Sequence, residues 1–287
     1  MVTPRTLEEA LEALAAEQGE RPVPYAGGTE LMTGRAGPRG PFLFLHRLSE
    51  LRGITQGRDM LRLGAGLSFS ELIESPLCPP LLLEATRRIA APGVRNLATL
   101  GGNICHASPA ADSLPPLYLY DAVLVLASRG PRGPRYRRLP IGDFILGPRR
   151  TALRAGELLT AVELPRIPAF SRWTYEKVGA RKAQAVSKVS FAAAAVLDQE
   201  GVIRDFRAAF GAVGPTVIRR RDLEESLRDR RPPGQGDIAG AYGSRLKPID
   251  DQRSTAEYRR TVCLNLLNHF LEALGTGPFT GNHAILR

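Results

Sequence analysis

Residues 99–112 read TLGGNICHASPAAD and decide how the rest of the chain is interpreted. Glycine has no Cβ and tolerates positive φ, so the pair Gly101-Gly102 can turn bare backbone N–H groups toward one spot. Such a concavity suits an anion, above all a phosphate. Asp112 adds a carboxylate nine residues after Asn103. A tight turn between two strands explains the glycines equally well, so this stretch alone predicts either a ligand cradle or a turn.

A second glycine pair, Gly27-Gly28, follows a short apolar run in YAGGTEL, residues 25–31. Two separate di-glycine turns, each leaving a strand, can hold the two halves of a pyrophosphate. Neither stretch matches G-x-G-x-x-G between a strand and a helix, and G-x-x-x-x-G-K-[ST] does not occur. The two pairs therefore do not predict a Rossmann site or a P-loop.

Apolar patterning predicts helices and strands in alternation, with a sheet near the C-terminus. A helix begins after Thr6, a capping residue, and ends near Gly19, and an amphipathic helix covers 257–274. The arginine-rich segment 128–138 reads as a solvated hairpin loop. The expected strands lie at 22–26, 42–45, 60–65, 121–127, 157–165, 172–178, 189–197, 202–212 and 216–218, the first two in a small βαβ unit and the last four in an antiparallel sheet.

The two glycine motifs, AGGTEL and TLGGNI, together resemble the FAD-binding (medium) subunit of the molybdenum hydroxylase family. That group includes the xanthine dehydrogenase flavin domain and the medium subunit of aerobic carbon monoxide dehydrogenase, and the resemblance extends along nearly the whole chain. It implies an α+β fold in two parts. Residues 1–166 would form a two-subdomain FAD-binding domain of the vanillyl-alcohol-oxidase/PCMH type, divided into about 1–53 and 54–166. Residues 167–287 would form a small C-terminal domain, similar to that of the carbon monoxide dehydrogenase flavoprotein, with an antiparallel sheet plus helices.

The resemblance implies FAD as the cofactor and assigns its binding residues position by position. The segments 24–31 and 99–103 would form two pyrophosphate loops. Asp112 matches a flavin-contacting aspartate, and a carboxylate accepts hydrogen bonds from ribityl or ribose hydroxyls. Lys177 matches a lysine near the flavin, where a cation stabilises negative charge; without the resemblance it reads as a strand-surface lysine. The expected cofactor-binding residues are Pro24, Tyr25, Ala26, Gly27, Gly28, Thr29, Glu30, Leu31, Ile89, Thr99, Leu100, Gly101, Gly102, Asn103, Asp112, Leu159 and Lys177.

Composition limits the other function classes. The 287-residue chain has a formal net charge of +10 and is 43% hydrophobic, which is enough for one large or two modest cores. Its arginines are spread through loops without a recognition-helix or ribonucleoprotein pattern, so no nucleic-acid partner is expected. We expect no membrane span and no signal peptide. The three cysteines are far apart and form no C-x-x-C, which predicts neither a disulfide nor a resident iron–sulfur cluster and indicates the cytoplasm.

The resemblance implies one subunit of a molybdenum hydroxylase complex. Electrons would pass from molybdopterin on a large subunit, through [2Fe–2S] clusters on a small subunit, to the FAD of this chain and then to an acceptor. No side chain is expected to act as a catalytic acid or base, no metal site is expected, and a homodimer of the isolated chain stays open. Gln184 stands where xanthine dehydrogenase has an acidic residue near the flavin, so the acceptor stays open. The alternatives are a self-contained FAD-dependent oxidoreductase with its own organic substrate and a basic, non-catalytic assembly or nucleic-acid-binding protein.

Overall fold

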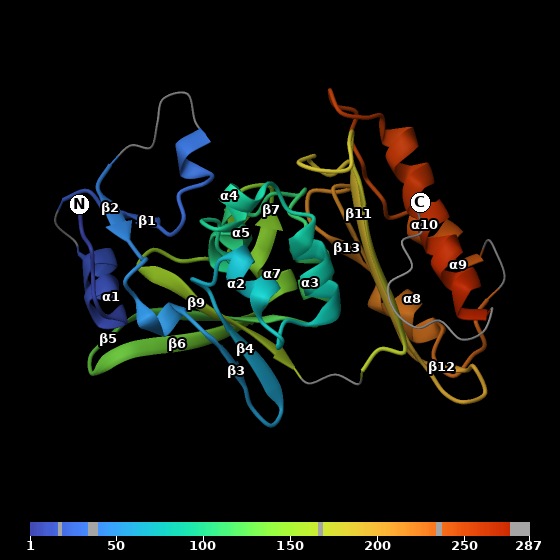
Figure 1. The fold of residues 1–287 in the computed structure, drawn as a ribbon, viewed down its shortest axis with the longest axis horizontal. Helices are drawn as coiled ribbons and strands as arrows, with labels where there is room; N and C mark the ends of the chain where they lie inside the picture. Colours follow the sequence, from blue (N-terminus) through green and yellow to red (C-terminus); the bar gives the residue numbers. More distant parts are fainter. Residues whose placement is uncertain (17–18, 34–39, 166–168, 234–236, 276–287) are drawn as a thin grey trace. The chain divides into compact units, whose positions relative to one another are not determined.

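The computed structural model describes residues 1–16, 19–33, 40–165, 169–233 and 237–275, which form two compact units (Figure 1). The first unit takes the described residues of 1–78, 90–108 and 121–165. The second takes 79–89, 109–120 and the described residues after 168. The chain therefore crosses between the units five times, and two short pieces of the N-terminal half pack with the C-terminal half.

The first unit begins with a capped helix and a two-stranded parallel sheet. The Thr6 hydroxyl accepts a hydrogen bond from the Glu9 amide at 3.2 Å, which confirms the expected start of α1. Strands β1 and β2 are parallel, as a βαβ-like connection requires. The elements of this unit are α1 (Leu7–Ala15), β1 (Val23–Tyr25), η1 (Leu31–Thr33), β2 (Phe42–Phe44), η2 (Ser49–Leu51), β3 (Ile54–Gln56), β4 (Met60–Gly64), α2 (Phe69–Glu74), α4 (Pro92–Arg95), α5 (Leu100–His106), β5 (Val123–Gly130), β6 (Gly133–Pro140), α7 (Ile141–Phe144), β7 (Ile145–Gly147), β8 (Arg150–Thr151) and β9 (Glu157–Pro165).

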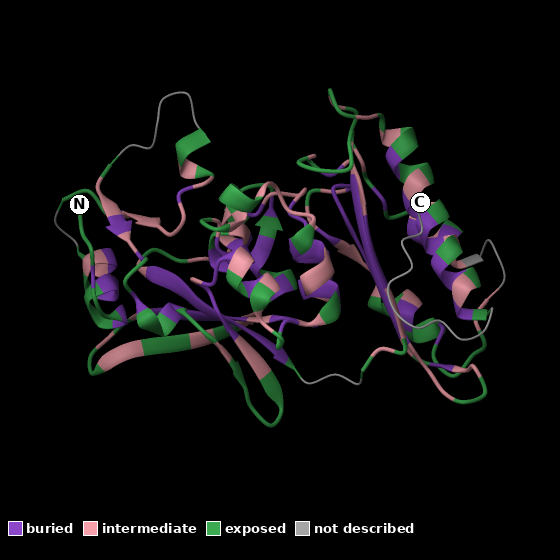
Figure 2. Cartoon of the chain, in the orientation of Figure 1, coloured by how far each residue is buried: buried purple, intermediate pink, exposed green. Residues whose placement is uncertain are grey.

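A five-stranded antiparallel sheet forms the centre of the first unit, in the order β3-β4-β9-β5-β6. Strand β9 lies between β4 and β5 and is buried from Glu157 to Leu164 (Figure 2). The apolar face of α1 packs with Leu43, Leu51 and Leu158 in one hydrophobic cluster. Ala26, at the start of the N-terminal glycine loop, packs against this cluster.

The arginine-rich segment 128–138 forms a hairpin, as expected, but it consists of the end of β5, a two-residue turn and most of β6, so the expected loop is wrong for most of its length. Strand β6 pairs with β5 over its whole length and forms the edge of the sheet. Arg137 donates to both oxygens of Glu157 at 2.7 Å, and Arg138 donates to Glu163 at 2.8 Å. These arginines satisfy carboxylates that β9 buries, and charged side chains on an edge strand disfavour pairing with another sheet.

The second unit is an antiparallel sheet, in the order β10-β11-β12-β13, with helices on both faces. Positions 189–195 of β11 are all buried (Figure 2), because α10 contacts this strand on one side and α6 also packs against it. The alanine run of β11 leaves room for these close contacts. The elements are α3 (Pro80–Arg87), α6 (Leu114–Leu119), β10 (Arg172–Val178), β11 (Val189–Leu197), β12 (Ile203–Gly211), β13 (Ile218–Arg219), α8 (Arg221–Ser226), α9 (Asp237–Gly243) and α10 (Ala256–Gly275).

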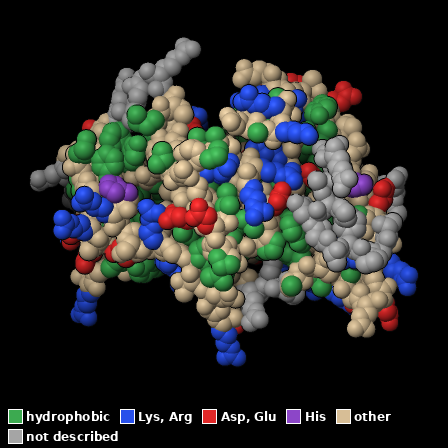
Figure 3. Space-filling model, viewed as in Figure 1, with side chains coloured by type: hydrophobic (Ala, Val, Ile, Leu, Met, Phe, Trp, Pro, Cys, Tyr) green, Lys and Arg blue, Asp and Glu red, His purple; other side chains and the backbone are tan. Residues whose placement is uncertain are grey.

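On the face drawn in Figure 3, Lys and Arg side chains are scattered, with acidic side chains between several of them. Several surface arginines are paired with acids, among them Arg204 with Asp198 at 2.7 Å. Among the described helices, none combines the length and the apolar character needed to cross a membrane.

Candidate cofactor site

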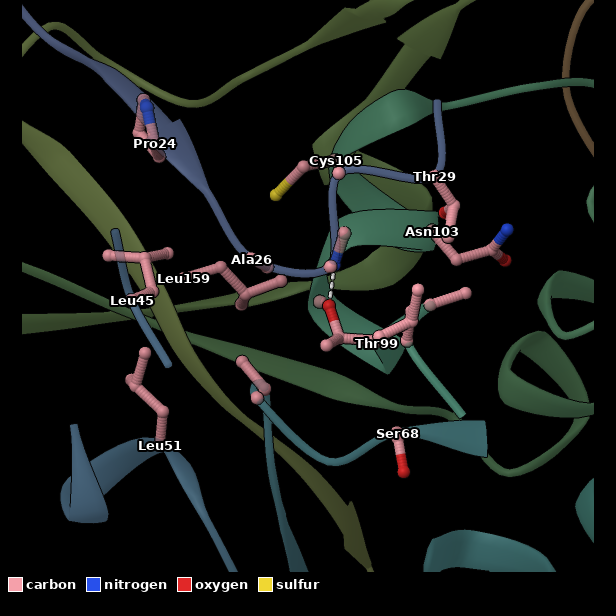
Figure 4. A pocket seen from close by; sticks show the side chains of 18 of the residues that line it. Pro24, Ala26, Thr29, Leu45, Leu51, Ser68, Thr99, Asn103, Cys105 and Leu159 are labelled. Carbon is pink, nitrogen blue, oxygen red and sulfur yellow. Dashed lines mark hydrogen bonds between the residues drawn. The ribbon is translucent and has the colours of Figure 1, made fainter. Parts of the chain in front are cut away.

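The first unit contains a cavity of about 480 Å³ where its two glycine motifs meet. Figure 4 shows Leu45, Leu51 and Leu159 on one side of this cavity and Thr29 and Asn103 on the other. The cavity thus has an apolar side and a side made of glycine loops and short polar residues. The sequence-predicted residues that line it are Pro24, Ala26, Gly27, Gly28, Thr29, Glu30, Leu31, Thr99, Gly101, Gly102, Asn103 and Leu159.

The N-terminal glycine loop is shaped by two close approaches. A Cβ built on Gly27 would lie 1.7 Å from the carbonyl oxygen of Leu97, so only glycine fits against that peptide. Gly28 has φ +69°, and a Cβ there would lie 2.0 Å from the hydroxyl oxygen of Tyr25. Tyr25 itself does not line the cavity; its ring packs on Phe44 at 5.0 Å between centroids and supports the loop from behind.

The backbone amides of this loop are available to a ligand. Within the described residues, the N–H groups of 26–30 donate to no backbone or side-chain acceptor, although the carbonyls of Gly28 and Glu30 accept from Met32 and Thr33. Consecutive unpaired N–H groups on a concave surface attract an anion. The expectation of a phosphate-sized cradle at Gly27-Gly28 therefore has a structural basis.

The second glycine pair works differently from the expectation. It opens a helix, α5, instead of a turn, and the Thr99 hydroxyl caps that helix by accepting from the Gly102 amide at 3.1 Å. The Gly101 amide donates to the Ala65 carbonyl at 2.8 Å, so neither glycine has the bare N–H group that we expected. A Cβ on Gly101 would lie 2.8 Å from the Cβ and the carbonyl oxygen of Ala65. The glycine is needed because the helix start packs directly on the end of β4.

The remaining expected residues fall into two groups. Leu100 is fully buried and lines no part of the cavity. Ile89, Asp112 and Lys177 belong to the second unit, and their roles at the cofactor stay predictions. The cavity is also lined by residues that the motifs did not indicate, namely Leu45, His46, Leu51, Arg52, Ala65, Gly66, Ser68, Asn96, Leu97, Ala98, Cys105, His106, Leu153 and Leu158. Of these residues, only Cys105 and His106 could have been suspected from the sequence, because they directly follow the TLGGNI motif.

In the second unit, Asp112 is the centre of a buried polar cluster. Lys177 Nζ donates to Asp112 Oδ2 at 2.6 Å, and the hydroxyls of Tyr175 and Ser187 donate to Oδ1 at 3.1 and 2.5 Å. Lys177 also donates to the Arg88 carbonyl at 2.8 Å. Burial, followed by the nearby Asp112 charge, raises the pKa of Tyr175 well above its ordinary value. The cluster neutralises a buried carboxylate and joins the segments that carry α3, α6 and β10.

Two side chains approach the carboxylate of Glu30, which lines the cavity of the first unit together with His106. The Oε1 atom of Glu30 lies 3.4 Å from His106 Nε2 and 3.7 Å from a guanidinium nitrogen of Arg149. Nearby, burial raises the pKa of the Cys105 thiol to about 12, so this cavity-lining sulfur is protonated at neutral pH. In the part of the chain that the structure describes, no group of three or more His, Cys, Asp or Glu side chains has the arrangement of a metal site.

The cavity fits the parts of FAD. Its unpaired amides at 26–30 match a pyrophosphate, and the leucines opposite them match a planar ring system that has to be shielded from water. The cradle exists only because Gly27 and Gly28 carry no Cβ. The residues present therefore suit a dinucleotide flavin.

Comparison with known proteins places these features in a family. A family model described as the FAD binding domain in molybdopterin dehydrogenase matches residues 1–167, and one for the CO dehydrogenase flavoprotein C-terminal domain matches 173–274. The chain is 39% identical over 190 residues to a putative xanthine dehydrogenase FAD-binding subunit of Escherichia coli, an alignment that covers 64% of this chain and 63% of that protein. It is 30% identical to the carbon monoxide dehydrogenase medium chain of Hydrogenophaga pseudoflava, with 94% of both chains covered.

Solved structures agree with the sequence comparison. A carbon monoxide dehydrogenase chain from Hydrogenophaga pseudoflava superposes with a TM-score of 0.85 and 28% identity, covering 95% of this chain and 96% of that one. The expected mixed fold with a C-terminal antiparallel sheet and the expected cofactor, FAD, are both confirmed. The chain belongs to the family of FAD-binding domains found in molybdopterin dehydrogenases.

Proposed function

We propose that this chain is the FAD-binding, electron-transferring subunit of a molybdenum hydroxylase complex. Its partners would be a large molybdopterin subunit and a small [2Fe–2S] subunit. Support comes from relatives that are themselves named as the medium chain of carbon monoxide dehydrogenase or the FAD-subunit of nicotinate dehydrogenase. Bound FAD supplies the redox chemistry between the donor clusters and the acceptor. This chain's own residues bind the cofactor, orient it and exclude water from it.

The observation that carries the proposal is that residues 26–30 line the cavity while their backbone amides donate to no acceptor among the described residues. A hydrogen bond to a charged group contributes about 1.5–3 kcal/mol, so even two of these amides on a phosphate provide a large share of the affinity. Thr99, the N-cap of α5, and Asn103 of α5 also line the cavity and add polar atoms to it, with Asn103 near Thr29 in Figure 4. We assign the pyrophosphate to this place and the apolar side near Leu159 to a ring of the cofactor.

The proposal can be tested by comparing the binding of FAD with that of a flavin that has no phosphate. The full-length chain is purified, stripped of flavin and titrated with FAD and with riboflavin, which has the same ring but no phosphate. We expect FAD to survive gel filtration with the protein and riboflavin to be lost. Equal retention of both ligands would mean that the phosphates of FAD add nothing to binding, and that the amides of residues 26–30 do not hold them. A folded chain that takes up no FAD, alone or with its partner subunits, would refute the proposal and reopen the other function classes.

Two further assignments belong to the same proposal. We infer a boundary between two domains near residue 166, which is supported by the family models ending at 167 and starting at 173. The segments 79–89 and 109–120 nevertheless pack with the second unit, so a truncation at residue 166 would expose apolar surface on both pieces. The cytoplasm is the compartment that we propose, because Cys78, Cys105 and Cys263 are all free thiols.

A further inference from the structure

Arg52 is the one lysine or arginine among the described residues that line the cavity of the first unit. It directly follows η2, whose last residue, Leu51, belongs to the apolar side of the cavity (Figure 4). The amides of residues 26–30, to which we assign the pyrophosphate, come from a different segment. A permanent positive charge with several N–H donors therefore joins the lining next to the apolar side.

The backbone of Arg52 is fixed by the contact between η2 and the end of β4. The Arg52 amide donates to the Ser49 carbonyl at 3.0 Å, which closes η2. The Gly66 amide donates to the Leu51 carbonyl at 2.8 Å. A Cβ on Gly64 would lie 2.8 Å from the carbonyl carbon of Arg52, so the two segments touch directly. Residue 52 therefore stays at the cavity as long as η2 packs on β4.

The side chain of Arg52 is held through one of its three nitrogens. Its Nη1 atom donates to both oxygens of Glu71 at 3.0 Å. Glu71 is itself fixed by the capping box of α2, in which the Ser68 amide donates to Glu71 Oε2 at 2.7 Å and the Glu71 amide donates to Ser68 Oγ at 3.2 Å. Within the described residues, Nε and Nη2 of Arg52 donate to no acceptor. The N–H groups on these two nitrogens therefore remain available to a ligand.

The chemistry of the guanidinium indicates which part of FAD it meets. The phosphates already have donors in the amides of residues 26–30. A guanidinium is planar, stacks on aromatic rings and donates in its own plane to nitrogen and oxygen acceptors. The adenine and isoalloxazine rings are planar and carry such acceptors along their edges. Leucine side chains can cover the faces of a ring but leave its acceptors unpaired, which costs free energy. Arg52 supplies donors of the matching kind beside these leucines.

We propose that Arg52 binds one of the two rings of FAD through its available guanidinium N–H groups, and that Glu71 is the positioning residue that holds the guanidinium at the cavity. The inference rests on the proposed function, since it assumes that FAD occupies this cavity. Arg52 then fixes a ring of the dinucleotide while the N-terminal glycine loop fixes its phosphates. The side chains of Arg52 and Glu71 are 41% and 44% exposed, so their ion pair contributes little to the fold by itself. A role in ligand binding can therefore be separated from a role in folding.

The test compares variants of the full-length, flavin-stripped chain in fluorescence titrations with FAD. Arg52→Met removes the donors and should raise the Kd about five- to thirtyfold, as expected for one charge-assisted hydrogen bond that is partly open to solvent. Arg52→Lys keeps the charge without the planar fork and should recover little of this loss. Glu71→Gln still caps α2 and still accepts from Arg52, so the Kd should rise less than about threefold. Arg204→Met, which breaks an exposed pair with Asp198 outside the cavity, should match the wild type.

Two fragments of FAD identify the ring. ADP carries the adenine end and is measured by its displacement of FAD, whereas FMN carries the flavin end and is titrated directly. Both fragments contain phosphate. Arg52→Met should weaken one fragment by about the same factor as FAD and leave the other unchanged. The melting temperatures of Arg52→Met and Glu71→Gln should fall by the same small amount, because both changes break the same exposed pair.

The outcomes separate this inference from the proposed function. A wild-type chain that binds no FAD overturns both. FAD that binds equally tightly to the wild type and to Arg52→Met overturns the inference alone. An equal loss in Arg52→Met and Glu71→Gln also overturns it, because the ion pair then acts only as support. A loss for both fragments or for neither, or full recovery in Arg52→Lys, likewise excludes a contact with one ring. Weaker binding of FAD and of one fragment in Arg52→Met, without recovery in Arg52→Lys, supports it.

Discussion

Adding a single methyl group at Gly27 should weaken FAD binding strongly while the chain still folds. In the structure, a Cβ at this position would lie 1.7 Å from the Leu97 carbonyl oxygen, and real Cβ atoms essentially never come closer than 3.0 Å to a neighbour. The loop and the peptide of Leu97 must therefore separate by at least 1.3 Å, the difference between these two distances. The peptide that follows cannot easily yield, because Ala98 donates to Val94 and accepts from Phe69. The glycine loop is therefore expected to move away from Leu97.

The magnitude follows from what the displaced loop loses. Moving the amides of residues 26–30 by more than an ångström would break at least one of the hydrogen bonds that we propose they donate to a phosphate. One charge-assisted bond at about 1.5–3 kcal/mol corresponds to a Kd that rises roughly ten- to 150-fold. The protein itself should lose about 1–3 kcal/mol of stability, the usual cost of overpacking. Gly27→Ala is therefore expected to fold and to bind FAD poorly.

The assay compares Gly27→Ala with Gly93→Ala, because a Cβ on Gly93 meets no atom within 4 Å. FAD affinity is measured by fluorescence titration of the flavin-free chains, and stability by urea unfolding. Gly93→Ala should match the wild type in affinity. If folded Gly27→Ala binds FAD as tightly as the wild type, the loop is not the cradle and the reasoning from its amides fails.

Three further changes test other parts of the structure. Thr99→Ala removes the hydroxyl that caps α5 and should cost about 1 kcal/mol in urea unfolding, with Thr99→Ser restoring it. Asp112→Asn leaves the buried ammonium of Lys177 without its charge partner and should cost about 3–5 kcal/mol, a loss that the double variant D112L/K177M should partly recover. The hydrogen bond from Arg137 lowers the pKa of Glu157, so this pair stabilises the fold at neutral pH and the stability is lost as the pH falls through the lowered pKa. The melting temperature of Arg137→Met should accordingly be lower than that of the wild type at pH 7, with the two converging in acid.

Local patterns in the sequence were sufficient for most of the regular elements. The capped helix α1, the parallel pair β1 and β2, and the strands of the C-terminal sheet lie where apolar spacing and turn residues predicted them. The family and the cofactor followed from two short glycine motifs, because their order and distance are far more specific than either motif alone. These features depend on residues that are close together in the chain.

The errors have a common physical origin in contacts between distant residues. Strand β6 was taken for a loop because its arginines look like a solvated surface, but Arg137 and Arg138 are partners of Glu157 and Glu163 on the buried strand β9. Helix α5 was missed because two adjacent glycines are poor helix formers, and nothing local indicates that a distant peptide requires them. In both cases the partner lies far away in the sequence, and no periodicity or turn signal reports it.

The two glycine pairs show why the same dipeptide predicts a shared site without predicting a shared role. At Gly101, the missing Cβ lets the start of α5 rest on Ala65, and the amide is used up in that contact. At Gly27, the missing Cβ lets the loop rest on Leu97 while its amides stay unpaired. One pair therefore builds the wall of the cavity and the other supplies its hydrogen-bond donors. A methyl group at Gly27 is therefore expected to weaken ligand binding more than the fold, whereas a methyl group at Gly101 is expected to disturb the packing of α5 on Ala65.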